Sequence, residues 1–181
     1  MYRVRGFLTL AAVLAVVAVG CTPPPAPLPD PILTCEALSG SITYDPPADS
    51  SGADVHLEIQ SASLAGCVDH TGGGVTSARI LGTFVLLEFT CGVKPAGSEI
   101  GTGIGRFDWS NGTSSDFSAV LRSPGSPNQF GVEFRITSGR WAGATADVQV
   151  GVVSSVGNCV QVPVTEAVLG SLEPFVLHPR T

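Results

Sequence analysis

From residue 40 onward the chain alternates short apolar and polar runs, and this pattern restricts the fold more than any other feature of the sequence. In "VHLEIQ", Val55, Leu57 and Ile59 would lie on one face of a strand and polar side chains on the other. Helical periodicity is nearly absent, and glycine or polar turns interrupt the runs every eight to twelve residues or so. The pattern predicts an all-β domain of about 8–10 short antiparallel strands, folded as a single β-barrel or β-sandwich.

Two hairpins stand out within this pattern. In "GIGRFDWSNGTSSDFSAVL" (103–121) two strands flank Asn111-Gly112, a dipeptide that predicts a two-residue type I′ turn. A second hairpin, "FGVEFRITSGRWAGATADVQVGVV" (130–153), predicts an inward face made of Phe130, Val132, Phe134, Ile136, Ala146, Val148, Val150 and Val152. Both hairpins have one apolar and one polar face, as expected for sheets that pack on one side.

Other features bear on strand phase and on the choice between barrel and sandwich. The run "ARILGTFVLLEFT" (78–90) is apolar almost throughout, and we expect Leu81, Val85, Leu87 and Phe89 to share a face. Glycines at 82, 101, 103, 105, 131, 143 and 151 suit strongly coiled strands. These glycines favour closure into a barrel over a sandwich.

The first twenty residues have the features of an export signal. Arg3 and Arg5 precede the apolar run "GFLTLAAVLAVVAVG", which ends in small residues. The run is shorter than the roughly 20 residues that a membrane-spanning helix needs. We therefore expect residues 1–20 to be a signal peptide.

The residues that follow resemble a lipoprotein processing site. Ala18, Val19, Gly20 and Cys21 are similar to a bacterial lipobox, in which the cysteine thiol is diacylated and becomes the first residue of the mature chain. Two acyl chains anchor a protein stably where one would not. The alternative is an ordinary secretory signal with a free or paired Cys21, which would give a secreted protein. The proline-rich stretch 21–34 then predicts a semi-rigid tether, and 35–181 the β-domain.

Composition restricts the partners of the exported chain. Without residues 1–20 it holds seven basic and fifteen acidic side chains, a net charge near −8. A chain with no basic patch has little to attract phosphates, so we expect no nucleic-acid partner.

The cysteines predict disulfides rather than a metal or redox site. With Cys21 set aside, an even number remains in an exported chain: Cys35, Cys67, Cys91 and Cys159. No pair has the C-x-x-C spacing of zinc or thioredoxin-type sites. Three pairings are open, and we favour Cys67–Cys91 with Cys35–Cys159.

Four segments carry a resemblance to a group of known proteins. "GSITYDPP", "AGCVDHTGGGVTSARILGTF", "GRFDWSNGTSSDFSA" and "ITSGRWAGA" resemble blocks of small secreted or lipid-anchored envelope proteins of actinobacteria. Proteins of this group have no assigned activity. The resemblance implies an exported all-β domain and supplies no catalytic residues.

The sequence offers few residues for chemistry. It has no G-x-S-x-G nucleophile motif and no histidine cluster at metal-ligand spacing, so we expect neither an enzyme nor a cofactor or metal site. Trp141, in the loop "SGRWAG", is a candidate contact residue, and a plug at the barrel end is its alternative role.

These observations leave two hypotheses. The first is a non-catalytic envelope lipoprotein with a surface binding or structural β-domain, whose partner is an unknown protein or the cell wall. The second is a barrel that carries a lipid or other small apolar ligand. The many inward Phe, Val and Ile residues favour a filled barrel, which ranks the carrier second.

Overall fold

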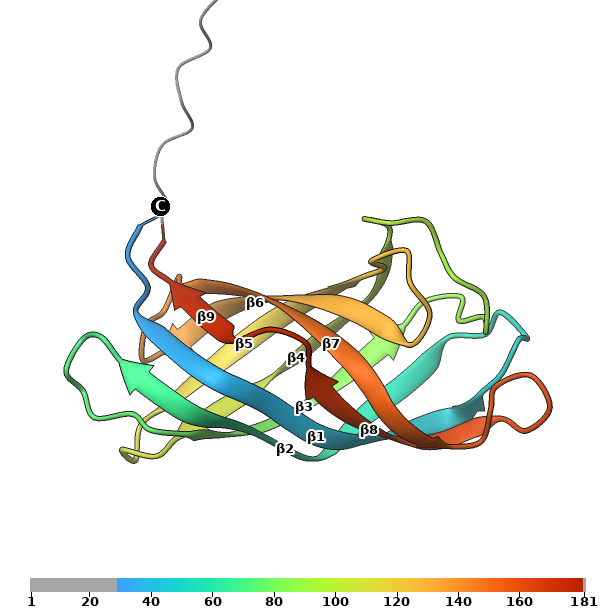
Figure 1. Cartoon of the computed structure of the whole chain (residues 1–181), viewed down its shortest axis with the longest axis horizontal. Helices are drawn as coiled ribbons and strands as arrows, with labels where there is room; N and C mark the ends of the chain where they lie inside the picture. The colour runs from blue at the N-terminus through green and yellow to red at the C-terminus, as the bar shows by residue number, and fades with distance from the viewer. Residues whose placement is uncertain (1–28, 181) are drawn as a thin grey trace, which may run out of the picture.

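The computed structural model describes residues 29–180, which form an antiparallel β-barrel (Figure 1). The predicted all-β fold is confirmed, and of the two architectures the barrel is the one observed. The nine strands of the described residues are β1 (Leu33–Ala48), β2 (Val55–Asp69), β3 (Ala78–Leu86), β4 (Glu99–Trp109), β5 (Ser114–Arg122), β6 (Gln129–Gly139), β7 (Thr145–Val156), β8 (Val164–Ser171) and β9 (Phe175–His178). Within residues 29–180 no helix is long and apolar enough to cross a membrane.

Consecutive strands pair around the barrel, and two short strands share the last position. β1 pairs with β2, and the order continues from β2 to β8. β8 pairs with β7 and with the second half of β1, while β9 pairs with the first residues of both β7 and β1. β8 and β9 are therefore two parts of one interrupted strand. The barrel has eight strand positions, and the interrupted strand closes it.

The two ends of the barrel differ. At the packed end β1 begins and β9 ends, so both ends of the described chain lie there, at the left of Figure 1. The four loops at the opposite, open end span residues 49–54, 87–98, 123–128 and 157–163. Because β1 starts at Leu33, the predicted tether would join the domain at the packed end.

Aromatic side chains fill the packed end. Phe107 is fully buried, and its ring centroid lies 4.8 Å from that of Phe117, 5.5 Å from Phe134 and 5.8 Å from Phe175. Trp109 stacks on Phe107 at 5.0 Å, which confirms that it belongs to the core. The expectation of a filled interior holds for this half of the barrel.

Polar side chains close the packed end above these rings. The indole Nε1 of Trp109 donates a hydrogen bond to the buried Ser115 hydroxyl at 2.9 Å. Arg140 donates to the carboxylate of Asp69 at 3.1 Å, and the Asp69 side chain is 2% exposed. Burial raises the pKa of Asp69, but hydrogen bonds from Thr71 and the Val75 backbone, with the charge of Arg140, outweigh it. The net pKa of Asp69 is lower than usual.

The first predicted hairpin is present, but its turn is of another kind. The Gly112 amide donates to the Trp109 carbonyl at 2.9 Å, and four residues (110–113) separate β4 from β5. Gly112 has a φ of 84°, whereas Asn111 is not among the residues with positive φ. A type I′ turn needs positive φ at both central residues, so the type I′ prediction was wrong. The Asn111 side chain instead accepts hydrogen bonds from the backbone and hydroxyl of Thr113.

The favoured disulfide pairing was also wrong. The disulfides are Cys35–Cys67 and Cys91–Cys159. Cys35 lies directly opposite Cys67 in the β1–β2 ladder, with 3.9 Å between the Cα atoms. The favoured pairing would require Cys67 and Cys91 to lie on neighbouring strands. β3 ends before Cys91, however, so these two residues lie at opposite ends of the barrel.

Candidate functional site

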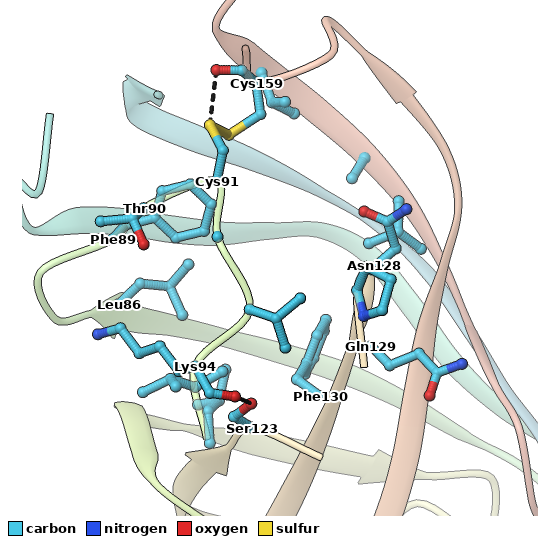
Figure 2. A pocket seen from close by; sticks show the side chains of 18 of the residues that line it. Leu86, Phe89, Thr90, Cys91, Lys94, Ser123, Asn128, Gln129, Phe130 and Cys159 are labelled. Carbon is cyan, nitrogen blue, oxygen red and sulfur yellow. Dashed lines mark hydrogen bonds between the residues drawn. A yellow bond between two sulfur atoms is a disulfide. The ribbon is translucent and has the colours of Figure 1, made fainter. Parts of the chain in front are cut away.

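A cavity of about 200 Å³ occupies the open end of the barrel. Its walls come from strands and loops on all sides, and most are apolar. They include Ile42, Tyr44, Leu57, Leu86, Phe130 and Val152. Figure 2 shows Phe89, Leu86 and Phe130 around the space, with the Cys91–Cys159 disulfide at one edge. The open end is thus hollow where the packed end is filled.

A second apolar space of about 50 Å³ lies deeper in the barrel. Ile42, Leu57, Leu121 and Phe130 line both spaces, so these four side chains separate the cavity from the middle of the barrel.

Inward glycines on β4 set the position of the aromatic rings near this boundary. A side chain on Gly103 would collide with the ring of Phe84, and one on Gly105 with the ring of Phe117. The glycines therefore let these two rings lie flat against β4. Strand β4 contributes only these small residues to the middle of the barrel, and bulky ones begin at Phe107 in the packed end.

The mouth of the cavity is built from loops that are fastened to one another. The disulfide joins Cys91, in the β3–β4 loop, to Cys159, in the β7–β8 loop. The amide of Phe89 donates to the Ala53 carbonyl at 3.0 Å, and the amide of Glu88 to the Asp54 carboxylate at 2.9 Å. The amide of Gly97, in the β3–β4 loop, donates to the carbonyl of Ser123, at the start of the β5–β6 loop, at 2.7 Å. All four open-end loops are therefore tied together.

Backbone conformations that side chains disfavour gather in these loops. Four non-glycine residues in the described range have positive φ, and three belong to the open end: Glu88 (45°), Asn128 (56°) and Cys159 (66°). Such conformations cost of order 1 kcal/mol or more, and they concentrate at functional sites. Their distribution points to the open end as the functional one.

Tyr44 and Lys94 are two of the polar side chains that line the cavity. Burial raises the pKa of Tyr44 to about 12, so its phenol stays protonated and can donate a hydrogen bond. Among the hydrogen bonds of residues 29–180, none involves the Tyr44 hydroxyl. Lys94 donates from Nζ to the Leu87 carbonyl at 2.9 Å, and its own carbonyl accepts from the Ser123 hydroxyl at 2.7 Å (Figure 2).

The site residues predicted from sequence fall in several places. Cys21, with the signal peptide and most of the tether, lies outside the described residues. Cys91 and Cys159 meet at the cavity, whereas Cys35 and Cys67 are buried near the packed end.

Trp141 is half-buried at the packed end, far from the cavity in the barrel. Its ring lies edge-on to Trp109 at 5.0 Å, and the Arg140 guanidinium lies 4.2 Å from its ring centroid. These contacts favour its alternative role as a plug at the barrel end.

Sequence reasoning did not identify the cavity residues. Lys94 was visible as the single lysine of the chain, in a loop just after a cysteine. Tyr44 was visible at the end of the short run "SITY". Neither signal indicates a cavity by itself, because a cavity depends on how several strands pack.

Comparisons with protein-family models, with characterised proteins and with solved structures each find no match. Within residues 29–180, no group of three or more His, Cys, Asp or Glu side chains is placed to hold a metal ion.

Proposed function

We propose that this protein is a non-catalytic binding protein of the cell envelope, and that its barrel takes a small apolar ligand into the cavity at the open end. The cavity of about 200 Å³ carries this proposal. Empty apolar space costs on the order of 24 cal/mol per Å³, or at most about 5 kcal/mol here, less where water enters the mouth. A ligand that fills the space would recover part of that free energy. The carrier hypothesis therefore takes first place.

The size of the cavity restricts the ligand. A buried cavity of about 150 Å³ is large enough to bind benzene. The space here suits a substituted benzene ring or an alkyl chain of about eight carbons. A longer chain would extend through the mouth or displace the Phe130 ring to reach the inner space.

The anchor would set the direction in which the mouth points. If Cys21 is acylated, the tether joins the barrel at Leu33 on the packed end. The cavity would then open away from the membrane that holds the anchor, toward ligands on the far side. Two disulfides are consistent with a location outside the cytoplasm.

Filling the cavity with a side chain tests the binding proposal. Ala167 is buried, lines the cavity and has empty space in front of it. We expect Ala167→Phe to keep the free energy of unfolding within about 1 kcal/mol while abolishing the calorimetric binding of 1-octanol. Ala146→Phe is the matched variant at the packed end, where the extra ring has no room. It should cost about 1–3 kcal/mol or more. If the unmodified protein binds neither 1-octanol nor toluene, the proposal fails.

The anchor has its own test. The intact mass of protein extracted from the envelope should equal the chain from Cys21 plus acyl groups, less four hydrogens for the two disulfides. Cys21→Ser should release the protein into the medium. Envelope retention of that variant would contradict the lipid anchor.

A second candidate function, binding through the barrel's outer surface, is favoured by the β7–β8 hairpin. Of ten exposed large apolar side chains in the described residues, five lie in this hairpin, Val153, Val156, Val160, Val162 and Val168, and a sixth, Leu172, directly follows it. Glu166 is the only charged residue between 153 and 172. Sedimentation over a range of protein concentrations tests whether these exposed apolar side chains join two copies of the chain. Val153→Ser and Val160→Ser serve as controls. A monomer at every concentration would remove self-association as its role.

A further inference from the structure

We infer that the cavity selects amphiphiles with an acidic head, such as a fatty carboxylate, and that Lys94 holds the head at the mouth while the apolar tail lies inside. This inference rests on the proposed function, because it assumes that the cavity takes an apolar ligand. It adds the chemical class of that ligand and the residue that recognises it.

The charge of the cavity wall is the first observation. Within residues 29–180, Lys94 is the only charged residue that lines the cavity, and no Asp or Glu lines it. It is also the only lysine of the whole chain. A chain with fifteen acidic residues repels anions over most of its surface. Lys94 gives the mouth of the cavity a local positive charge that can attract them.

The second observation is that the ammonium group has donors to spare. An ammonium has three N–H donors, and the hydrogen bond from Nζ to the Leu87 carbonyl uses one of them. The three salt bridges of the described residues all join arginines to Asp or Glu, and none includes Lys94. Lys94 is half-buried, and its ammonium bonds to the exposed Leu87 at the rim of the cavity, where a ligand from solvent can reach it. A carboxylate brought in by the ligand would supply the missing partner.

The backbone of Lys94 is held in place, and one hydrogen bond, to the Leu87 carbonyl, holds its side chain. The Ser123 hydroxyl donates to the Lys94 carbonyl at 2.7 Å, and the buried Ser123 hydroxyl also accepts from the Gly125 amide at 3.2 Å. Figure 2 shows the lysine side chain beside Leu86, on the wall of the cavity. A short rotation of this flexible stem would aim the ammonium at a head group in the mouth.

Neutral polar groups would complete the head-group site. Thr90 and Ser126 line the same cavity and can donate hydrogen bonds to carboxylate oxygens. The deeper space is lined almost entirely by apolar side chains, which suits a hydrocarbon tail. Polar groups near the mouth and apolar walls inside match the two parts of an amphiphile.

A comparison of two ligands of equal chain length tests the inference. Octanoate and 1-octanol have the same hydrocarbon tail but differ in the charge of the head group. Calorimetric titration of the purified, oxidised protein with each ligand therefore measures how much the charged head contributes to affinity. We expect octanoate to bind more tightly than 1-octanol. Lys94→Met should lower the affinity for octanoate by about tenfold and change the affinity for 1-octanol by less than about twofold. Lys94→Arg keeps the charge and should retain the preference for octanoate.

A charge-matched control distinguishes the local effect of Lys94 from the effect of the protein's net charge. Arg79 is exposed on β3, and Arg79→Met removes the same charge without touching the cavity, so octanoate affinity should stay the same. If octanoate binds no better than 1-octanol, or is indifferent to Lys94→Met, the inference is overturned while the apolar site stands. If neither ligand binds, the proposed function and this inference fail together.

Discussion

Removal of the Cys91–Cys159 disulfide should loosen the mouth of the cavity and destabilise the barrel. The two cysteines are 68 residues apart. In the chain-entropy model, a cross-link over that separation stabilises the folded state by about 4 kcal/mol. For a domain of this size, the loss corresponds to a fall in Tm of about 10–15 °C. We expect Cys91→Ser/Cys159→Ser to show this loss in urea unfolding followed by tryptophan fluorescence.

The second disulfide provides a matched comparison. Cys35 and Cys67 are 32 residues apart, and the same model gives nearly the same stabilisation, just under about 4 kcal/mol. Cys35→Ala/Cys67→Ala avoids burying two hydroxyl groups at this apolar site. The two double variants should therefore differ little in stability and clearly in ligand affinity.

Ligand affinity distinguishes the two disulfides because only one borders the cavity. Titration with 1-octanol should show weaker binding to Cys91→Ser/Cys159→Ser and unchanged binding to Cys35→Ala/Cys67→Ala. A stability loss below about 1 kcal/mol for the first variant would mean that the loop hydrogen bonds alone hold the mouth, which would refute the entropy reasoning. Equal weakening in both variants would refute the assignment of the cavity to the open end.

Three further predictions concern single groups. Because the pKa of Asp69 is lowered in the folded state, its stabilisation is present above about pH 4 and is lost on further acidification. In urea unfolding, the free energy of unfolding of Asp69→Asn should therefore fall less steeply with decreasing pH than that of the unmodified protein. An unchanged dependence on pH would contradict the lowered pKa. Tyr44 is the only tyrosine in residues 29–180, so ultraviolet titration should give a pKa of about 12, and stability should fall as pH rises above about 10, where only the unfolded chain releases the proton. Titration near 10 would mean that the phenol is solvated. Ser115→Ala leaves the buried Nε1 of Trp109 without an acceptor and should cost about 1–3 kcal/mol of unfolding free energy, whereas exposed Ser114→Ala should be nearly neutral.

Strands with one polar face could be predicted from the sequence. In β6 and β7 the alternation of Phe, Val and Ile with charged or small polar residues matches the observed inward face, including the buried Val132, Phe134 and Val148. β3 was different, because apolar side chains lie on both of its faces. Leu81 and Val85 do share a face, but the buried face is the other one, with Ile80 and Phe84, and Leu87 and Phe89 lie beyond the end of the strand.

The disulfide pairing and the cavity could not be predicted from local pattern. Pairing depends on where strands end, and Cys91 lies in a loop beyond β3 rather than on a strand beside Cys67. The cavity is an absence of atoms that results from the combined sizes of residues on several strands. Gly103 on β4 and Ala167 on β8 both face the interior, but the residues around them in the sequence do not predict a cavity at either position.

The interrupted strand has a consequence for how the molecule assembles. Until residues 164–178 are in place, β1 and β7 each present an unpaired edge, and such edges invite pairing with other chains. The edge of β1 pairs with β8 and β9, which come more than a hundred residues after it, and such long-range closure slows folding. A chain that is synthesised from its N-terminus would therefore keep the β1 edge unpaired until residues 164–178 have been made, and would be open to pairing with neighbouring chains until then.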